Sequence, residues 1–169
     1  MFKLVKSPII LVIIALFIFN LIHQENLLLY TLEFYLLMVL IKEDEESYEV
    51  SIFNLLLFFI VKIIFIIING SAVSLSTIIF ANILFTVIYL FSNKSMGLGD
   101  VILNGILSIS YSDIYSYFLY FTFTFTFGAI DSIIKIRFLN MRLKSKVPFI
   151  KYLVLGYYFT SFMGGRFVF

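Results

Sequence analysis

The succession of long apolar segments along the chain restricts its fold more than any other feature. Each segment is apolar throughout and lacks the alternation of outer-membrane strands, which favours helices that cross a bilayer. A spanning helix needs about 20 apolar residues, so we expect an all-α integral membrane protein with about six to seven transmembrane helices. We expect one membrane-embedded domain over residues 1–169. The segments are residues 8–22, 27–41, 52–68, 72–91, 101–110, 114–134 and 149–163.

The composition agrees with a bilayer as the surroundings of the chain. Hydrophobic residues make up 62% of the sequence and charged residues 13%, about half the charged share of a soluble domain. The net charge of +2 is too small to indicate a nucleic-acid partner. The chain has no Cys and one histidine, His23, so we predict no metal site and no cofactor.

The basic residues predict how the helices are oriented. Lys3 and Lys6 place the N-terminus in the cytoplasm by the positive-inside rule. With alternating helices, the other connections that carry Lys or Arg, residues 42–51, 92–100 and 135–148, also lie inside. We therefore predict a multi-pass protein of the cell inner (plasma) membrane with a cytoplasmic N-terminus.

One polar motif interrupts the apolar chain at this predicted cytoplasmic face. It reads Gly97-Leu98-Gly99-Asp100 and directly precedes an apolar segment. A carboxylate beside a bilayer is costly and needs a reason. The two glycines permit a sharp turn and a close approach of another segment. Asp100 is either half of a catalytic pair or a helix cap.

Three blocks of the chain resemble the type IV prepilin peptidases, the GxGD aspartic proteases of the inner membrane. The first block is a helix that ends in Asp44, the second is Gly-x-Gly-Asp followed by Val101, and the third opens the last apolar segment. The resemblance implies that Asp44 and Asp100 are the catalytic pair. It also implies site-shaping roles for Gly97, Gly99, Pro148, Phe149 and Gly156.

The chain departs from the family pattern at several positions. Val50-Ser51 stands for Ile-Pro, Ile102 for a lysine, and Ile150-Lys151 for Gly-Pro, and the cysteine-rich insert associated with N-methylation is missing. The resemblance therefore implies a short, divergent peptidase without methyltransferase activity. It would act in type IV pilus assembly or protein secretion. Its partner would be a membrane-inserted prepilin-like or pseudopilin-like precursor with a basic leader, cleaved at the cytoplasmic face.

The first aspartate has neighbours that compete for its role. Glu43 is the next candidate for the pair, and the acidic run is either a solvated loop or a patch that attracts the basic leader. This run comprises Glu43, Glu45, Glu46 and Glu49 beside Asp44. Asp100 begins a helix and Asp44 ends one, so the helix dipoles predict an ionised Asp100 as base and a protonated Asp44 as acid.

Two other functions are alternatives to the interpretation as a prepilin peptidase. Presenilin-like intramembrane proteases share the tetrad, but they add a Tyr-Asp before it and a Pro-Ala-Leu after it, and this chain has neither. A non-catalytic subunit for membrane assembly or transport would use the aspartates for capping or ion binding.

Further polar residues inside the apolar segments predict structural contacts. Glu33 and Lys62 fall within two different segments and can neutralise each other as a pair. Asp131 lies four residues before Lys135 on one helix face, which favours an ion pair. The alternation of Phe and Thr over residues 121–127 has a strand-like period. We nevertheless expect a helix there, with Thr hydroxyls bonded to carbonyls one turn back.

Overall fold

A computed structural model describes residues 8–21, 26–69, 73–92, 96–139 and 147–163. Within these ranges the chain is all-α, as the sequence predicts, and it contains no strand. The helices are α1 (Pro8–Leu21), α2 (Leu27–Ser47), α3 (Ile52–Asn69), α4 (Leu75–Phe91), α5 (Leu98–Ser108), α6 (Ile114–Leu139) and α7 (Ile150–Phe162). Each expected segment corresponds to one helix, and α2 and α6 extend beyond their apolar parts by about 5 residues.

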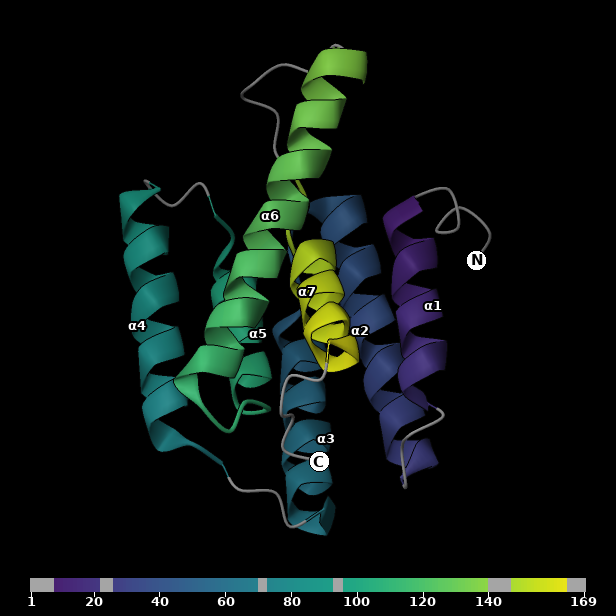
Figure 1. The fold of residues 1–169 in the computed structure, drawn as a ribbon, viewed down its shortest axis with the longest axis vertical. Coiled ribbons are helices and arrows are strands. Elements are labelled where there is room, and N and C mark those ends of the chain that lie inside the picture. Colours follow the sequence, from purple (N-terminus) through teal and green to yellow (C-terminus); the bar gives the residue numbers. More distant parts are fainter. Residues whose placement is uncertain (1–7, 22–25, 70–72, 93–95, 140–146, 164–169) are drawn as a thin grey trace.

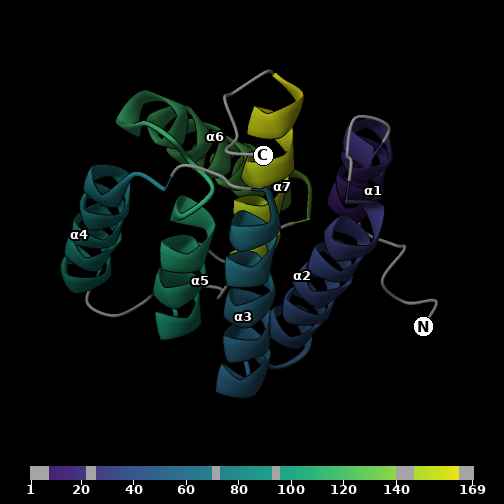
Figure 2. The same cartoon turned by 90° about the horizontal axis from the view of Figure 1, so that it is seen from below.

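The helices run alternately up and down (Figure 1). The yellow α7 lies in the middle of the bundle and contacts α1, α2, α5 and α6. Figure 2, which views the bundle from below, shows α3, α4 and α5 around one side and α1 and α2 on the other. Ten of the 13 residues of α7 are buried, so this helix is the core element around which the others pack.

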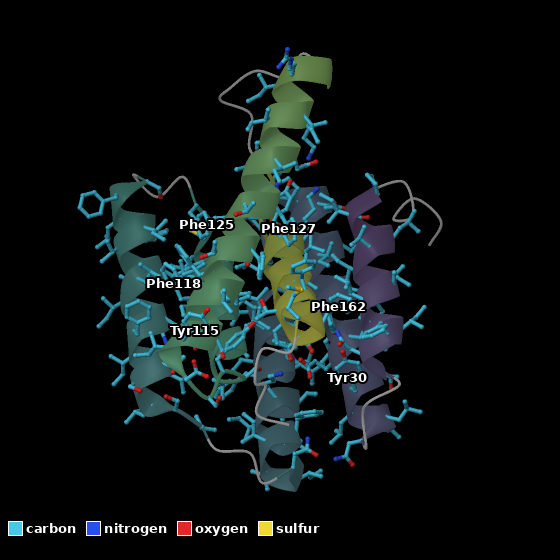
Figure 3. The ribbon with its side chains drawn as sticks, viewed as in Figure 1. Tyr30, Tyr115, Phe118, Phe125, Phe127 and Phe162 are labelled. Atoms are coloured by element: carbon cyan, nitrogen blue, oxygen red, sulfur yellow. The ribbon has the colours of Figure 1, made fainter. Side chains whose placement is uncertain are left out.

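Aromatic side chains fill much of the space between the helices (Figure 3). Tyr30 of α2 stacks on Phe17 of α1 with ring centroids 5.2 Å apart. Phe125 of α6 meets Phe149, just before α7, at 5.3 Å. The Thr hydroxyls of α6 bond to carbonyls one turn back, from Thr122 to Phe118 at 2.8 Å and from Thr126 to Thr122 at 2.7 Å. The expected helix across the Phe-Thr alternation is therefore confirmed.

Two stretches of the described chain are long and apolar enough to cross a membrane, Ile52–Asn69 and Ile114–Arg137. Helices α1, α4 and α5 are apolar but shorter. The outer faces carry large exposed apolar side chains, such as Phe53 at 71% and Phe91 at 84% exposure. A full bundle of transmembrane helices remains a prediction.

Most of the described cations lie at one end of the bundle. Lys42 is in the last turns of α2, Lys135 and Arg137 are near the end of α6, and Lys151 is in the first turn of α7. These helix ends meet, because α7 begins beside the end of α2 and packs on α6. This distribution agrees with the predicted charge asymmetry. Lys3 and Lys6, on which the predicted orientation depends, and His23 lie outside the described residues.

Candidate active site

Asp44 lies near the end of α2 and is held by the start of α7. Helix α2 continues to Ser47 and ends at Tyr48, a left-handed residue (φ 55°) whose N–H donates to the Asp44 carbonyl at 3.1 Å. Pro148 and Phe149 precede α7, and the first backbone N–H groups of a helix have no partner within it. The Ile150 N–H donates to Asp44 Oδ2 at 2.9 Å. Asp44 therefore caps a helix that begins more than 100 residues later in the chain.

Asp100 lies in the first turn of α5, where it makes a reciprocal contact with Gly97. The Gly97 N–H donates to Asp100 Oδ2 at 3.1 Å, and the Asp100 N–H donates to the Gly97 carbonyl at 3.2 Å. A Cβ at residue 97 would lie 3.2 Å from Asp100 Oδ2, which explains the glycine. Gly97 is thus the N-cap of α5, and Asp100 completes the cap from the third helical position. The catalytic role of Asp100 remains a prediction.

The second glycine of the tetrad brings α5 against the connection between α2 and α3. A Cβ on Gly99 would lie 3.2 Å from Val50 Cβ. Val50 follows Asp44 by six residues, so the two aspartates come to the same end of the bundle from separate helices. Each is 6% exposed. Two carboxyl groups with this little exposure and a shared neighbourhood influence each other's ionisation.

The environments of the two aspartates differ, and this difference sets which one ionises first. Both lie outside the apolar segments, Asp44 after Ile41 and Asp100 before Val101. Burial and, to a smaller extent, the nearby charge of Asp44 raise the pKa of Asp100 to about 7, against the lowering effect of the Gly97 N–H. Burial also raises the pKa of Asp44, but the Ile150 N–H and the Lys151 charge oppose that shift.

This arrangement reverses the protonation order expected from helix ends. The C-terminal end of α2 disfavours a charge on Asp44, but the positive N-terminal end of α7 faces the same carboxylate and donates a hydrogen bond to it. These surroundings favour ionisation of Asp44 before Asp100, which is the opposite of the order predicted from the helix ends. The order predicted from the sequence considers only the dipole of the helix that carries each aspartate. The N-terminal end of α7 acts on Asp44 as well and favours the opposite order.

The four glutamates of the acidic run have separate positions. Glu43 accepts from the Ser51 N–H at 3.0 Å and from the Asn54 amide, so it caps α3 and is not the partner of Asp100. Glu45 pairs with Lys151 at 3.1 Å. Glu46 lies 4.0 Å from exposed Lys42, and Glu49 is exposed. Only Glu46 and Glu49 of this run stay exposed for an attraction to a basic leader.

The third predicted block has a packing role next to the site. Phe149 lies between the rings of Phe125 and Tyr152, at 5.3 and 5.8 Å. A Cβ at Gly156 would collide with the Thr124 hydroxyl and lie 3.1 Å from its backbone nitrogen. Pro148 and Phe149 directly precede α7, and their site-shaping role remains a prediction. Gly156 instead permits the close crossing of α6 and α7.

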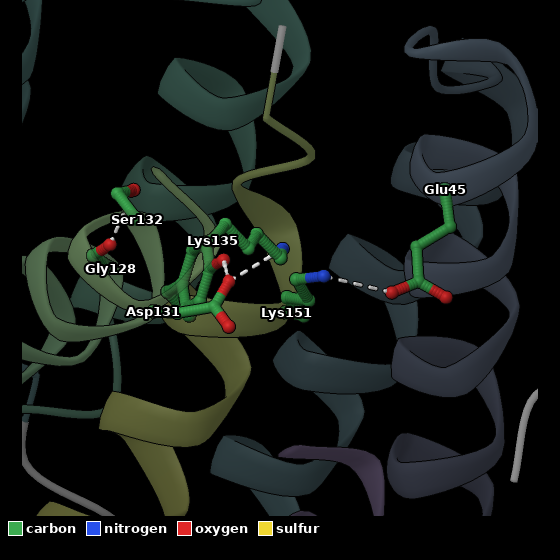
Figure 4. A network of polar contacts seen from close by, with 7 residues as sticks. Glu45, Gly128, Asp131, Ser132, Lys135 and Lys151 are labelled. Carbon is green, nitrogen blue, oxygen red and sulfur yellow. Dashed lines mark hydrogen bonds and ion pairs between the residues drawn. The ribbon is translucent and has the colours of Figure 1, made fainter. Parts of the chain in front are cut away.

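Sequence reasoning missed a polar network beside Asp44 (Figure 4). The Lys151 ammonium reaches Glu45, and Asp131 is bound by Lys135 at 2.6 Å and by the Tyr152 hydroxyl. The expected Asp131–Lys135 pair is confirmed, and so is the Glu33–Lys62 pair, at 2.8 Å in the core. Glu45 and Lys151 are 106 residues apart, and no local spacing connects them.

The described residues offer no group of three or more His, Cys, Asp or Glu side chains that could hold a metal ion. Comparisons with protein-family models, with curated proteins and with solved structures found no match to this chain. The geometry of the aspartates and their surroundings therefore carries the functional argument.

Proposed function

We propose that the chain is a membrane aspartyl endopeptidase that cleaves the leader of a prepilin-like or pseudopilin-like precursor at the cytoplasmic membrane face. One observation carries this proposal: two nearly buried aspartates from separate helices meet at one end of an apolar bundle, and their surroundings shift their pKa values unequally. A pair of carboxyl groups in different protonation states can hydrolyse a peptide bond by general acid-base catalysis.

The unequal environments assign a role to each aspartate. Ionised Asp44 takes a proton from water while the water oxygen bonds to the peptide carbonyl carbon, and Asp100 gives its proton to the carbonyl oxygen. When the intermediate collapses, the C–N bond breaks and the leaving amine takes the proton held by Asp44. Asp100 recovers its proton from the new carboxyl group, so the pair returns to its starting state.

An apolar groove between α3 and α5 supports the substrate class. It has a volume of about 350 Å³ and runs between α3 and α5, starting two residues after Asp100. The groove is lined by Ile52, Leu55, Leu56, Phe59, Ile102 and Ile106. A precursor whose leader directly precedes an apolar helix could place that helix in the groove and its cleavage site at the aspartates. Ile102, where the family has lysine, is one wall of this groove.

Co-expression of the chain with pilin-like precursors from the same genome tests the proposal. We expect processing by the wild type and a loss of at least about 100-fold in Asp44→Asn and Asp100→Asn. Asp113→Asn is the matched control, because Asp113 also caps a helix by accepting from the Ser116 N–H at 2.8 Å, in the connection before α6. This variant should process normally. Normal processing by either dyad variant would contradict the proposal.

A non-catalytic membrane subunit is the second candidate, and one observation favours it. Each aspartate accepts a backbone hydrogen bond at the start of a helix, which is a sufficient structural reason for its presence. In that case the wild type would process no precursor. The Asn variants of Asp44, Asp100 and Asp113 would then show comparable losses of stability.

A further inference from the structure

Lys151 occupies an unusual position for a lysine at the end of the bundle. Its side chain is 6% exposed, whereas those of Lys42 and Lys135 are 51% and 22% exposed. A buried ammonium needs a compensating charge, and Glu45 provides one at 3.1 Å. Lys151 directly follows Ile150, whose N–H binds Asp44, so its backbone is fixed beside the dyad.

The neighbouring anion on α6 has direct partners of its own. Asp131 is already bound by Lys135 at 2.6 Å and by the Tyr152 hydroxyl (Figure 4). The Lys151 side chain points to the other side, toward α2, where Glu45 and Asp44 are consecutive residues. Two adjacent carboxylates at the end of one helix repel each other and the helix dipole. The Lys151 ammonium, which lies between these carboxylates and α6, offsets that repulsion.

We infer that Lys151 is a positioning residue of the dyad: held by Glu45, its buried ammonium is the counter-charge that keeps Asp44 ionised and ready to act as the base. This inference rests on the proposed peptidase function. The charged and titratable groups that act on Asp44 are Glu45 on its own helix, Lys151 and Tyr152 on α7, and Asp100 on α5. Lys151 is the one cation among them.

The charge of Lys151 gives the dyad a cation that residue 102 does not supply. Ile102 is 39% exposed and lies in the wall of the apolar groove on the α5 side. The Lys151 cation lies on the α7 side, where it pairs with Glu45 of α2. A cation on this side favours ionisation of Asp44 over Asp100, which keeps the two carboxyl groups in different protonation states.

Infrared titration of the full chain in lipid nanodiscs tests the inference without a substrate. The Asp44 carboxyl band is assigned by its loss in Asp44→Asn. In Lys151→Met we expect the midpoint of this band to move up by about one pH unit or more. Glu45→Gln removes an anion and should move it down, and Lys151→Arg should retain the wild-type midpoint. Lys42→Met is the control, since this exposed lysine should leave the midpoint unchanged.

Opposite shifts in Lys151→Met and Glu45→Gln would support the inference, because a general loss of structure would move both variants the same way. An unchanged midpoint in Lys151→Met, or an equal shift in Lys42→Met, would overturn it. Precursor cleavage is measured in parallel, with the acid limb of its pH profile expected to follow the midpoint. The two variants could show opposite shifts while the wild type cleaves no precursor. That result would refute the peptidase function and leave the coupling of Lys151 to Asp44 established.

Discussion

The carboxylates of α2 show two ways of placing an acid inside an apolar bundle. Glu33, in the core, accepts from the Lys62 ammonium and from the Tyr157 hydroxyl, each at 2.8 Å, and Lys62 also donates to Tyr157 at 2.7 Å. Asp44, three turns later, accepts from a backbone N–H, while Lys151 pairs with the neighbouring Glu45. The core acid is thus neutralised by a direct ion pair, and the acid at the bundle end is not.

This difference separates a structural acid from one suited to proton transfer. The Glu33 carboxylate is engaged by the Lys62 ammonium and the Tyr157 hydroxyl, so its contacts are those of a structural ion pair. A carboxylate stabilised by a helix end and a more distant cation, next to a second carboxyl group, can gain and lose a proton with modest energy. We therefore place function at the bundle end and stability in the core.

Breaking the core pair should have the largest effect. Lys62→Met leaves Glu33 as an uncompensated charge, and we expect a loss of about 3–5 kcal/mol in unfolding free energy. The measurement is reversible unfolding in mixed micelles by circular dichroism. The double variant Glu33→Gln/Lys62→Met is the control and should recover most of the loss. A single variant as stable as the wild type would show that the pair is not sealed from water.

Gly156→Ala should have an intermediate effect and should act through packing alone. The added methyl group meets Thr124 at the crossing of α6 and α7, and overpacking of this kind costs about 1–3 kcal/mol. The same unfolding measurement detects it. Gly156→Ala/Thr124→Ala removes the hydroxyl in the way and should regain part of the stability. If the pair of changes costs the sum of the single ones, the two residues do not meet as described.

The pH dependence of cleavage should show the smallest effect, about tenfold per pH unit on the alkaline side. Cleavage requires a proton on Asp100, and the pKa of Asp100 is raised to about 7, so activity should fall as pH rises above that value. On the acid side, activity should fall as Asp44 gains a proton, at a pH above the ordinary range for aspartate because burial raises its pKa.

The control for this profile comes from the core. Glu33→Gln changes a carboxylate that the mechanism does not use, and its effect on stability is followed separately. The folded fraction of this variant should keep both limbs of the wild-type profile. If either limb of the pH profile shifts in Glu33→Gln relative to the wild type, the core acid and the dyad are coupled. The distinction between the two regions would then be wrong.

Much of the fold followed from local patterns in the sequence. The helix bounds are set by runs of apolar residues, and the Thr back-bonding in α6 and the Asp131–Lys135 pair depend on spacings of four residues. The Glu33–Lys62 pair spans two helices, but it was predictable because each charge needs a partner in an apolar setting. These features need little knowledge of how the helices rotate.

The site was less predictable, because it depends on how α7 faces α2. The bond from the Ile150 N–H to Asp44 and the Glu45–Lys151 pair each join residues 106 positions apart. No local pattern fixes the rotation of α7 that produces them. The protonation order predicted from α2 and α5 alone was reversed for this reason, and Glu43, a neighbour of Asp44 in sequence, turned out to cap α3.

The position of α7 has a consequence for how the protein is made. The ribosome adds Asp44 long before it reaches Ile150. During synthesis, Asp44 therefore first lacks both the Ile150 N–H and the Lys151 charge. Until α7 enters the middle of the bundle, water serves as the partner of Asp44, and the carboxylate keeps an ordinary acidity. The order of translation therefore delays completion of the dyad until all the other described helices have been synthesised.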